Sequence, residues 1–174
     1  MNEKLSKLTS YLSFKLGEET FAANVSKVLN ILEMTKITKV PKAPDYMKGV
    51  INLRGAVLPL IDTRIKFGLT ATEFTANTCI LVLDITIGDE TLQVGGLVDA
   101  VQEVLEIEPQ QILPPPNIGN KYHSEFISGM YKASEDQFIM ILDMDKVFSV
   151  DEMMEVNETI NKNDRLNKEE LKYV

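Results

Sequence analysis

The sequence predicts an all-β protein made of two small barrels packed side by side, and three observations lead to this fold class. Short runs rich in β-branched and aromatic residues recur along the chain and are separated by turn residues. A pattern of about 70 residues occurs twice. No uncharged apolar run approaches the roughly 18 residues of a membrane span. We expect each copy to close into a barrel, because closure removes exposed sheet edges.

The repeat begins with two matching strand–turn–strand segments. "YLSFKLGEETFAANV" starts at Tyr11 and "ILVLDITIGDETLQVGGLV" starts at Ile80, and each contains a glycine followed by an acidic turn. Corresponding residues then stay 73 positions apart, in the pairs Val25 and Val98, Val28 and Val101, Leu32 and Leu105, Glu33 and Glu106, and Pro41 and Pro114. Further on, Gly49 matches Gly129 and Asp62 matches Asp143. The two barrel halves are therefore expected at about 11–70 and 79–150.

Each copy ends in an aspartate followed by a brief amphipathic turn, "DTRIKF" or "DMDKVF". The recurrence predicts that Asp62 and Asp143 are helix N-caps, whose side chains accept hydrogen bonds from free backbone N–H groups. Pro59 lies inside the strand "AVLPLI", where it cannot donate a ladder hydrogen bond, and it predicts an edge strand or a bulge.

The two ends of the chain differ from the repeat. Residues 1–10 are expected to be flexible. Residues 151–174 lose the aromatic and β-branched runs and are expected to be helical or mobile, with a short helix that docks through its apolar side. That side carries Met153, Met154, Val156 and Ile160.

Composition argues against several classes of function. The net charge of −8 and the lack of a basic stripe exclude a nucleic-acid partner. The opening residues have no apolar segment of a secretory signal, so we expect a cytoplasmic protein without membrane insertion. Cys79 is expected to be a buried, inert thiol, and His123 has no partner histidine or nearby nucleophile. Asp143 and Asp145 suit a magnesium ion less well than a helix cap. The sequence therefore predicts no catalytic residues, no metal and no cofactor.

Arg54 lies in the hydrophobic stretch "GVINLRGAVLPLID" and needs an explanation, because a charge buried without a partner would cost several kcal/mol. It can reach water at a hairpin tip where Gly55 supplies a positive φ, pair with an internal acid, or face a partner molecule. The second copy has Ser134 and Glu135 at these positions, so the barrel itself does not require the pair.

The stretch "KGVINLRGAVLPLIDTRIKFG", residues 48–68, resembles the CheW family, the bacterial chemotaxis coupling proteins. The flanking stretches "FKLGEETFAANVSKVLNI" and "VGGLVDAVQEVL" are similar to that family in order and spacing, and the resemblance runs from about Tyr11 to Phe148. The residues that match the family signature are Gly49, Asn52, Arg54, Gly55, Pro59 and Asp62.

This resemblance implies two SH3-like five-stranded barrels and a non-catalytic scaffold. Such a scaffold joins the cytoplasmic tips of chemoreceptors to the regulatory domain of the histidine kinase CheA, and it is recruited from the cytoplasm to membrane-associated receptor arrays. The receptor tip would lie in a groove between the barrels, and Arg54 would stabilise that groove by a charged contact near its mouth. The groove residues implied by position are Leu12, Val25, Val28, Ile31, Arg54, Val98 and Val101.

Ordinary core packing is the alternative for each of these valines. Family members often have an acid where this chain has Asn30, which can offer only a neutral hydrogen bond to Arg54; Glu33 is the nearest substitute in sequence. The family usually has leucine at the position of Thr63, which indicates a packing variation. Two other functions remain open. One is an adaptor for a parallel, non-chemotaxis kinase pathway; the other is a small ligand-binding barrel or enzyme, which would show converging titratable groups in a pocket.

Overall fold

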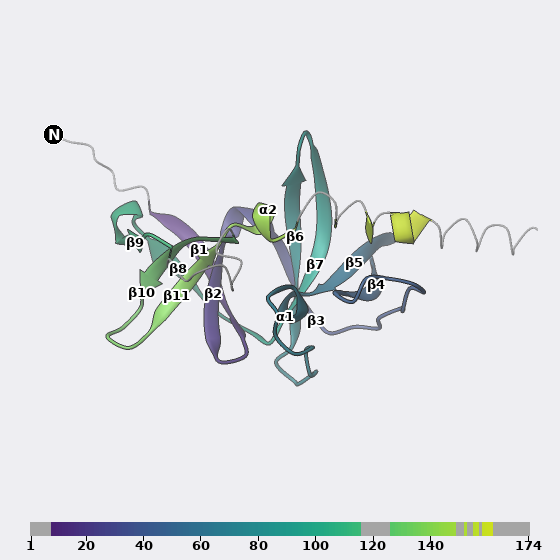
Figure 1. Cartoon of the computed structure of the whole chain (residues 1–174), viewed down its shortest axis with the longest axis horizontal. Coiled ribbons are helices and arrows are strands. Elements are labelled where there is room, and N and C mark those ends of the chain that lie inside the picture. The colour runs from purple at the N-terminus through teal and green to yellow at the C-terminus, as the bar shows by residue number, and fades with distance from the viewer. Residues whose placement is uncertain (1–7, 116–125, 149–151, 153–154, 157, 162–174) are drawn as a thin grey trace, which may run out of the picture.

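A computed structural model describes residues 8–115, 126–148, 152, 155–156 and 158–161, whose strands form two sheets lying side by side (Figure 1). The all-β fold class is confirmed. The strands are β1 (Thr9–Leu16), β2 (Glu19–Asn24), β3 (Val28–Glu33), β4 (Met47–Leu53), β5 (Ala56–Asp62), β6 (Cys79–Ile87), β7 (Glu90–Val98), β8 (Ala100–Ile107), β9 (Ile112–Leu113), β10 (Ile127–Lys132) and β11 (Phe138–Leu142). The short helices are η1 (Val25–Lys27), α1 (Thr63–Lys66), η2 (Pro109–Gln111) and α2 (Met144–Val147).

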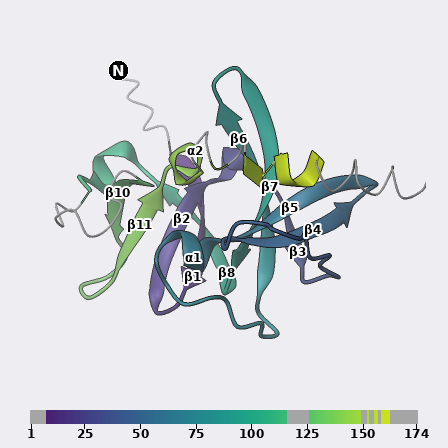
Figure 2. The ribbon, with the colours of Figure 1, turned by 45° about the vertical axis from the view of Figure 1, so that its right-hand side comes forward.

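The two sheets exchange their first hairpins. One sheet has the strand order β8-β1-β2-β11-β10-β9, and the other has the order β3-β6-β7-β5-β4. The hairpin β1–β2 of the first copy therefore lies with strands of the second copy, and the hairpin β6–β7 lies with strands of the first (Figure 2). The expectation that residues 11–70 and 79–150 each make one barrel is wrong. The copies carry the same hydrophobic pattern, so the hairpin of either copy can complete the sheet of the other.

The exchange keeps the internal repeat intact. Strand β3 pairs antiparallel with β6, and its counterpart β8 pairs antiparallel with β1. Likewise β5 runs parallel to β7, and its counterpart β11 runs parallel to β2. Every pairing in one sheet thus has an equivalent in the other, which is the structural expression of the spacing found in the sequence.

Each sheet is closed by a short segment that follows its edge strand. In one sheet β9 follows β8 and pairs with β10; in the other the bridge between Thr38 and Val50 plays the same part. Gly49 and Gly129 lie at these crossings. A Cβ at Gly49, where φ is 149°, would overlap the Thr38 carbonyl oxygen, and a Cβ at Gly129 would overlap the Ile112 side chain. The matching glycines are explained by this close approach of two backbones.

Pro59 does not lie on an edge strand or at the bulge of its strand pair. Strand β5 lies between β4 and β7, and Pro59 faces Val50, whose N–H and C=O both bond Thr38 instead, at 2.8 and 2.9 Å. Pairing of β5 with β7 begins only at Leu60. The proline therefore removes no ladder hydrogen bond, and the expected edge or bulge is not needed.

The core is continuous between the two sheets. The larger buried cluster takes Leu12, Phe14 and Leu16 from β1 and Leu81, Leu83 and Ile85 from β6. We call this cluster the shared core. A second cluster of buried residues, around Leu58, Leu60 and Ile80, fills the barrel that β3, β6, β7, β5 and β4 form. Alternate residues of β6 face the two clusters, so this strand is buried on both sides and joins the barrels into one unit.

The chain after α2 returns to the β4–β5 side of the molecule. Residues 152, 155–156 and 158–161 are helical, and Val156 is buried in the shared core. Glu152 forms an ion pair with Lys66, and the Tyr46 hydroxyl donates a hydrogen bond to Glu155 Oε2 at 3.3 Å. Met153, Met154 and residues 1–7 lie outside the described residues. Among the described residues, no helix is long and apolar enough to cross a membrane.

Candidate functional site

Four apolar residues on the edge strands of the two sheets border the shared core. On β3, Val28 and Ile31 lie opposite Leu83 and Leu81; on β8, Val101 and Val104 lie opposite Phe14 and Leu12. Directly opposed residues of antiparallel strands point to the same face, so all four side chains face the junction of the barrels. Ile31 is 46% exposed and Val104 57% exposed. We call Val28, Ile31, Val101 and Val104 the seam.

The residues expected in the groove separate into exposed and buried sets. Val28, Ile31 and Val101 belong to the seam, and Val25, in η1, is 37% exposed. Leu12 and Val98 are 5% and 0% exposed and belong to the shared core. These two side chains support the seam from beneath and have no surface to offer a partner, so we remove them from the contact residues.

Val104 is the seam residue that the sequence analysis missed. It lies 73 positions after Ile31, the spacing that relates the other seam residues, so the repeat itself could have identified it. A β-bulge interrupts each pairing, between Val28 and Asn30 on β3 and between Leu12 and Phe14 opposite β8. The extra residue of a bulge brings positions three apart onto one face, whereas simple alternation would not.

Arg54 lies at the tip of the β4–β5 hairpin. Arg54 and Gly55 have φ values of 53° and 87°, and Leu53 pairs with Ala56 across them. Two positive φ values in a two-residue loop are typical of a type I′ turn. The Asn52 carboxamide oxygen accepts a hydrogen bond from the Gly55 N–H at 2.8 Å. The signature residues Asn52 and Gly55 thus build the turn, and Arg54 is exposed on it.

Asn30 does not pair with Arg54. Its carboxamide oxygen accepts a hydrogen bond from the Ile31 N–H at 2.8 Å. Arg54 has no hydrogen bond or ion pair with any side chain in the described part of the chain. An internal acid therefore does not account for this arginine, which leaves the solvated tip and the external partner.

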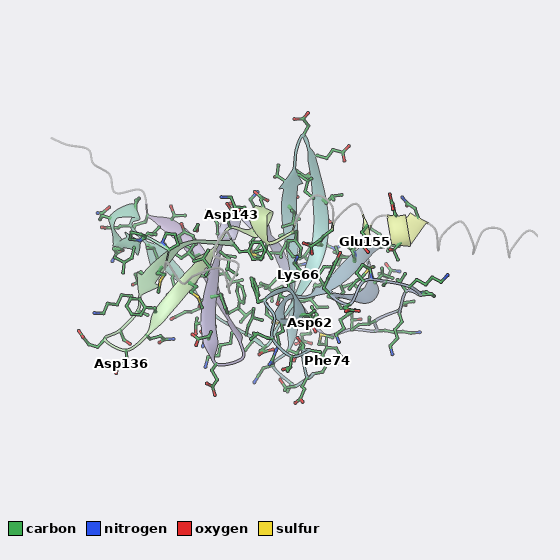
Figure 3. The ribbon with its side chains drawn as sticks, viewed as in Figure 1. Asp62, Lys66, Phe74, Asp136, Asp143 and Glu155 are labelled. Carbon is green, nitrogen blue, oxygen red and sulfur yellow. The ribbon has the colours of Figure 1, made fainter. Side chains whose placement is uncertain are left out.

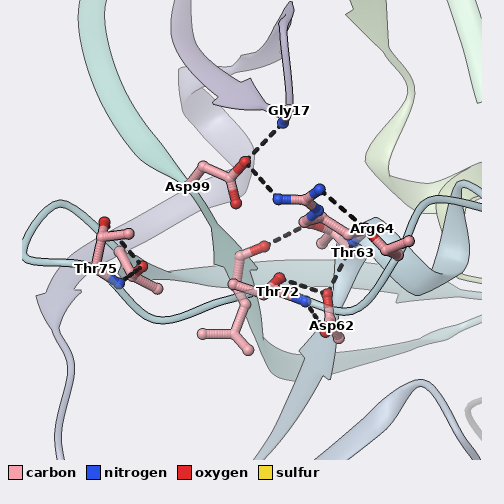
Figure 4. Close-up of polar contacts among 10 residues, drawn as sticks. Gly17, Asp62, Thr63, Arg64, Thr72, Thr75 and Asp99 are labelled. Atoms are coloured by element: carbon pink, nitrogen blue, oxygen red, sulfur yellow. Dashed lines mark hydrogen bonds and ion pairs between the residues drawn. The ribbon is translucent and has the colours of Figure 1, made fainter.

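The side chain of Asp62 makes several hydrogen bonds at the start of α1, and Figure 4 shows them. Its side chain is 0% exposed and accepts hydrogen bonds from Arg64 N at 3.1 Å, Thr72 N at 2.9 Å and Thr72 Oγ1 at 2.7 Å. Asp143 accepts one from Asp145 N at 3.1 Å. Both aspartates are N-caps, as predicted. The Thr63 hydroxyl donates a hydrogen bond to the Leu97 carbonyl oxygen at 2.5 Å. This bond satisfies the hydroxyl at the position where the family that the sequence resembles usually has leucine.

Two ion pairs tie the exchanged hairpins to the short helices. Arg64 of α1 binds Asp99 at 3.1 Å, and Asp99 also accepts from Gly17 N in the β1–β2 turn at 2.6 Å. At the equivalent position of α2, Asp145 binds Lys27 at 2.9 Å and accepts from Thr86 N in the other hairpin at 2.9 Å. The charges are reversed between the two sites. Figure 3 shows Asp62 and Asp143, the residues that begin these helices, on the two sides of the junction.

The charged residues of one pocket in the described part of the chain already have structural partners. A pocket of about 200 Å³ lies between β1, η1, β10 and β11, and its charged residues are Lys27 and Asp143. Lys27 is paired with Asp145, and Asp143 caps α2, so both have structural partners. Cys79 is half-buried; burial raises the pKa of its thiol, and a backbone hydrogen bond from Val101 opposes this shift. No group of three or more metal-ligating side chains occurs within the described ranges, and His123 lies outside them.

Known proteins resemble this chain in sequence and in fold. The CheW-like domain family model matches residues 10–152. The chain belongs to the CheW-like domain family. It is 36% identical to the chemotaxis protein CheW of Rhizobium meliloti over 137 residues, which cover 79% of this chain and 85% of that protein. It is 34% identical to the chemotaxis protein CheW of Klebsiella aerogenes over 139 residues, covering 80% and 81%.

A solved structure agrees with the fold. The crystal structure of the scaffolding protein TtCheW from Thermoanaerobacter tengcongensis matches with a TM-score of 0.72 and 29% sequence identity, and the match covers 86% of this chain and 94% of that chain. This likeness covers most of the chain and supports a CheW-like fold for the arrangement of two sheets.

Proposed function

We propose that this protein is a non-catalytic scaffold that couples the cytoplasmic tips of chemoreceptors to the regulatory domain of the kinase CheA. It works in the cytoplasm and is recruited to receptor arrays at the membrane. The observation that carries the proposal is the seam, in which equivalent strands of two barrels present apolar side chains on one face. Apolar contact with a polar rim is typical of a protein-binding surface.

The receptor tip is the proposed occupant of the seam. Val28 and Val101 are partly buried against the shared core, which fixes their positions, while Ile31 and Val104 extend outward. Side chains already held by a core lose little conformational freedom on binding, so their contact area contributes efficiently to affinity. Val25 extends the seam at the start of β3.

Arg54 is the proposed charged contact with the partner. Its side chain is exposed on a turn whose backbone is held by Asn52, so the direction in which it leaves the backbone is fixed. A positive φ is unfavourable for a residue with a Cβ. Arginine at this position is therefore unfavourable for the conformation of the turn, and we attribute its presence to contact with the partner.

Co-sedimentation with a chemoreceptor signalling fragment and CheA tests the proposal. The wild-type chain should sediment with both and raise kinase activity in the assembly. Val104→Asp should weaken receptor binding at least tenfold, because a charge in an apolar contact is desolvated without a partner. Phe138→Asp is the matched control, since Phe138 is an exposed apolar residue on the same sheet but outside the seam.

The two variants separate the possible results. Equal losses for Val104→Asp and Phe138→Asp would mean that the seam is not the receptor surface. A wild-type chain that binds neither the receptor fragment nor CheA would instead support an adaptor for another kinase pathway. Circular dichroism of each variant verifies that the fold is retained.

A further inference from the structure

The two walls of the seam carry the same residue pattern, and each ends in an acid. On β3 the groove-facing residues are Val28, Ile31 and Glu33, and on β8 they are Val101, Val104 and Glu106. Glu33 is two residues beyond Ile31, and Glu106 is two residues beyond Val104, so alternation places both carboxylates on the same faces as the seam residues. Their cross-strand partners are Cys79 and Ser10.

These two acids lie at opposite ends of the seam. Glu33 is opposite Cys79, and Cys79 and Val101 both pack against the shared core, so the end of β3 lies toward the start of β8. By the same reasoning from the internal repeat we place Glu106, which lies opposite Ser10 near the start of β1, toward the other end of the seam. Five residues of strand, from Val28 to Glu33, span about 17 Å at roughly 3.3 Å per residue. The two carboxylates are therefore separated by a distance on the order of 17 Å along the seam.

Neither carboxylate is used by the fold. Glu33 and Glu106 are both exposed. No ion pair or hydrogen bond joins either side chain to another residue in the part of the chain that the structure describes. Other acids near the junction, such as Asp99 and Asp145, are committed to Arg64 and Lys27. The seam thus offers a partner an apolar strip with one unpaired negative charge at each end.

We infer that Glu33 and Glu106 determine which helical segments this seam accepts, and that the occupant is an amphipathic helix with an apolar stripe and a lysine or arginine at each end of it. This inference rests on the proposed function and adds the charge pattern of the partner. A helix rises about 1.5 Å per residue, so a span of about 17 Å corresponds to basic residues about 11 positions apart. Eleven residues make about three turns, which returns both basic side chains to one face.

The division of roles follows from the burial of each group. The apolar side chains supply most of the affinity, because they remove apolar area from water. The exposed carboxylates fix the register of the helix and select against a partner with acids at those positions, since like charges at an interface are repulsive. Because the two walls run in opposite directions, a helix meets an acid at each end whichever way it enters.

Charge substitutions at the two positions test the inference. The probe is a chemoreceptor cytoplasmic signalling fragment, and its dissociation constant is measured at 50 mM and 300 mM sodium chloride, concentrations on either side of physiological screening, roughly 0.15 M. Glu33→Gln and Glu106→Gln should each weaken binding about two- to fivefold at low salt. The double variant Glu33→Lys with Glu106→Lys should weaken it about tenfold or more, and its binding should no longer fall as salt is added.

The matched control is Glu103→Lys, an exposed acid on β8 that directly precedes Val104 and therefore faces away from the seam. It should change the dissociation constant less than twofold. Reversal of basic residues on the probe helix to glutamate should restore binding to the double lysine variant of the scaffold. Wild-type affinity for the double lysine variant at low salt, or an equal loss for Glu103→Lys, would overturn the inference.

The result remains distinct from a failure of the proposed function. If Val104→Asp abolishes binding while the double lysine variant binds as wild type does, the seam is the receptor surface and only the role of the acids is wrong. If none of these substitutions changes binding, the receptor does not use the seam, and both proposals are wrong.

Discussion

Removal of the Asp62 carboxylate should destabilise the protein far more than removal of Asp143, its counterpart in the repeat. Asp62→Ala loses a helix N-cap, which contributes about 1 kcal/mol. It also leaves the N–H and hydroxyl of the buried Thr72 without their acceptor, and each unsatisfied donor costs about 1–3 kcal/mol. The free energy of unfolding should therefore fall by about 3–7 kcal/mol. Asp143→Ala loses a single hydrogen bond in a half-buried position, so we expect a loss of about 1 kcal/mol.

Urea unfolding followed by circular dichroism, together with the thermal midpoint, measures this difference. For a chain of this size each kcal/mol shifts the midpoint by about 2–4 °C, so Asp62→Ala should lower it by roughly 10 °C or more and Asp143→Ala by roughly 3 °C. Asp62→Asn keeps one acceptor oxygen and should fall between them. Equal losses for the two alanine variants would show that the contacts of Thr72 contribute nothing and would refute this reasoning.

Three further predictions concern the turn at Arg54, the glycine Gly49 and the half-buried Tyr46. Arg54→Asn should raise the free energy of unfolding by about 0.5 kcal/mol, because asparagine tolerates a positive φ, and should lower receptor affinity about tenfold; unchanged affinity would leave Arg54 as a turn residue only. Gly49→Ala should cost about 2 kcal/mol or more in urea unfolding, since its Cβ meets backbone, whereas Gly17→Ala, with nothing within 4 Å, should cost about 1 kcal/mol. Burial raises the pKa of Tyr46, so the unfolded chain ionises first and stability should fall as pH rises above 10.0. Tyr46→Phe should make that fall shallower, and an identical pH profile of the urea midpoint would contradict the assignment.

Local features of the fold could be predicted from the sequence because they depend on neighbouring residues. The caps at Asp62 and Asp143 follow from a carboxylate placed before a helical turn, and both were identified correctly. The close approach at Gly49 and Gly129 was visible only as a recurrence, since the residues that they contact lie on separate segments. The exchange of hairpins could not be predicted, because two copies with one hydrophobic pattern satisfy either pairing equally well.

The site was predicted in part for the same reason. A valine that borders a core and a valine inside it have the same sequence pattern, so Val28 and Val98 could not be distinguished before the pairing of strands was known. Leu12 was misplaced because β1 is covered by the shared core on that face. Val104 was within reach of the sequence, since the repeat relates it to Ile31, but the bulge that turns it to the seam is a tertiary feature.

The exchange of hairpins also determines how the chain can fold. A polypeptide ending near residue 76 would contain β1–β2 without the strands that flank them and β3–β5 without β6 and β7. The five-stranded sheet is complete only after residue 98 and the six-stranded sheet only after residue 142, so the first copy alone can close neither sheet and its apolar faces stay uncovered until then. The final contacts join segments far apart in sequence, and such topologies fold slowly. Two separately produced halves would together contain every strand. Each half could complete its sheets only by binding the other half or by exchanging hairpins with another copy of itself.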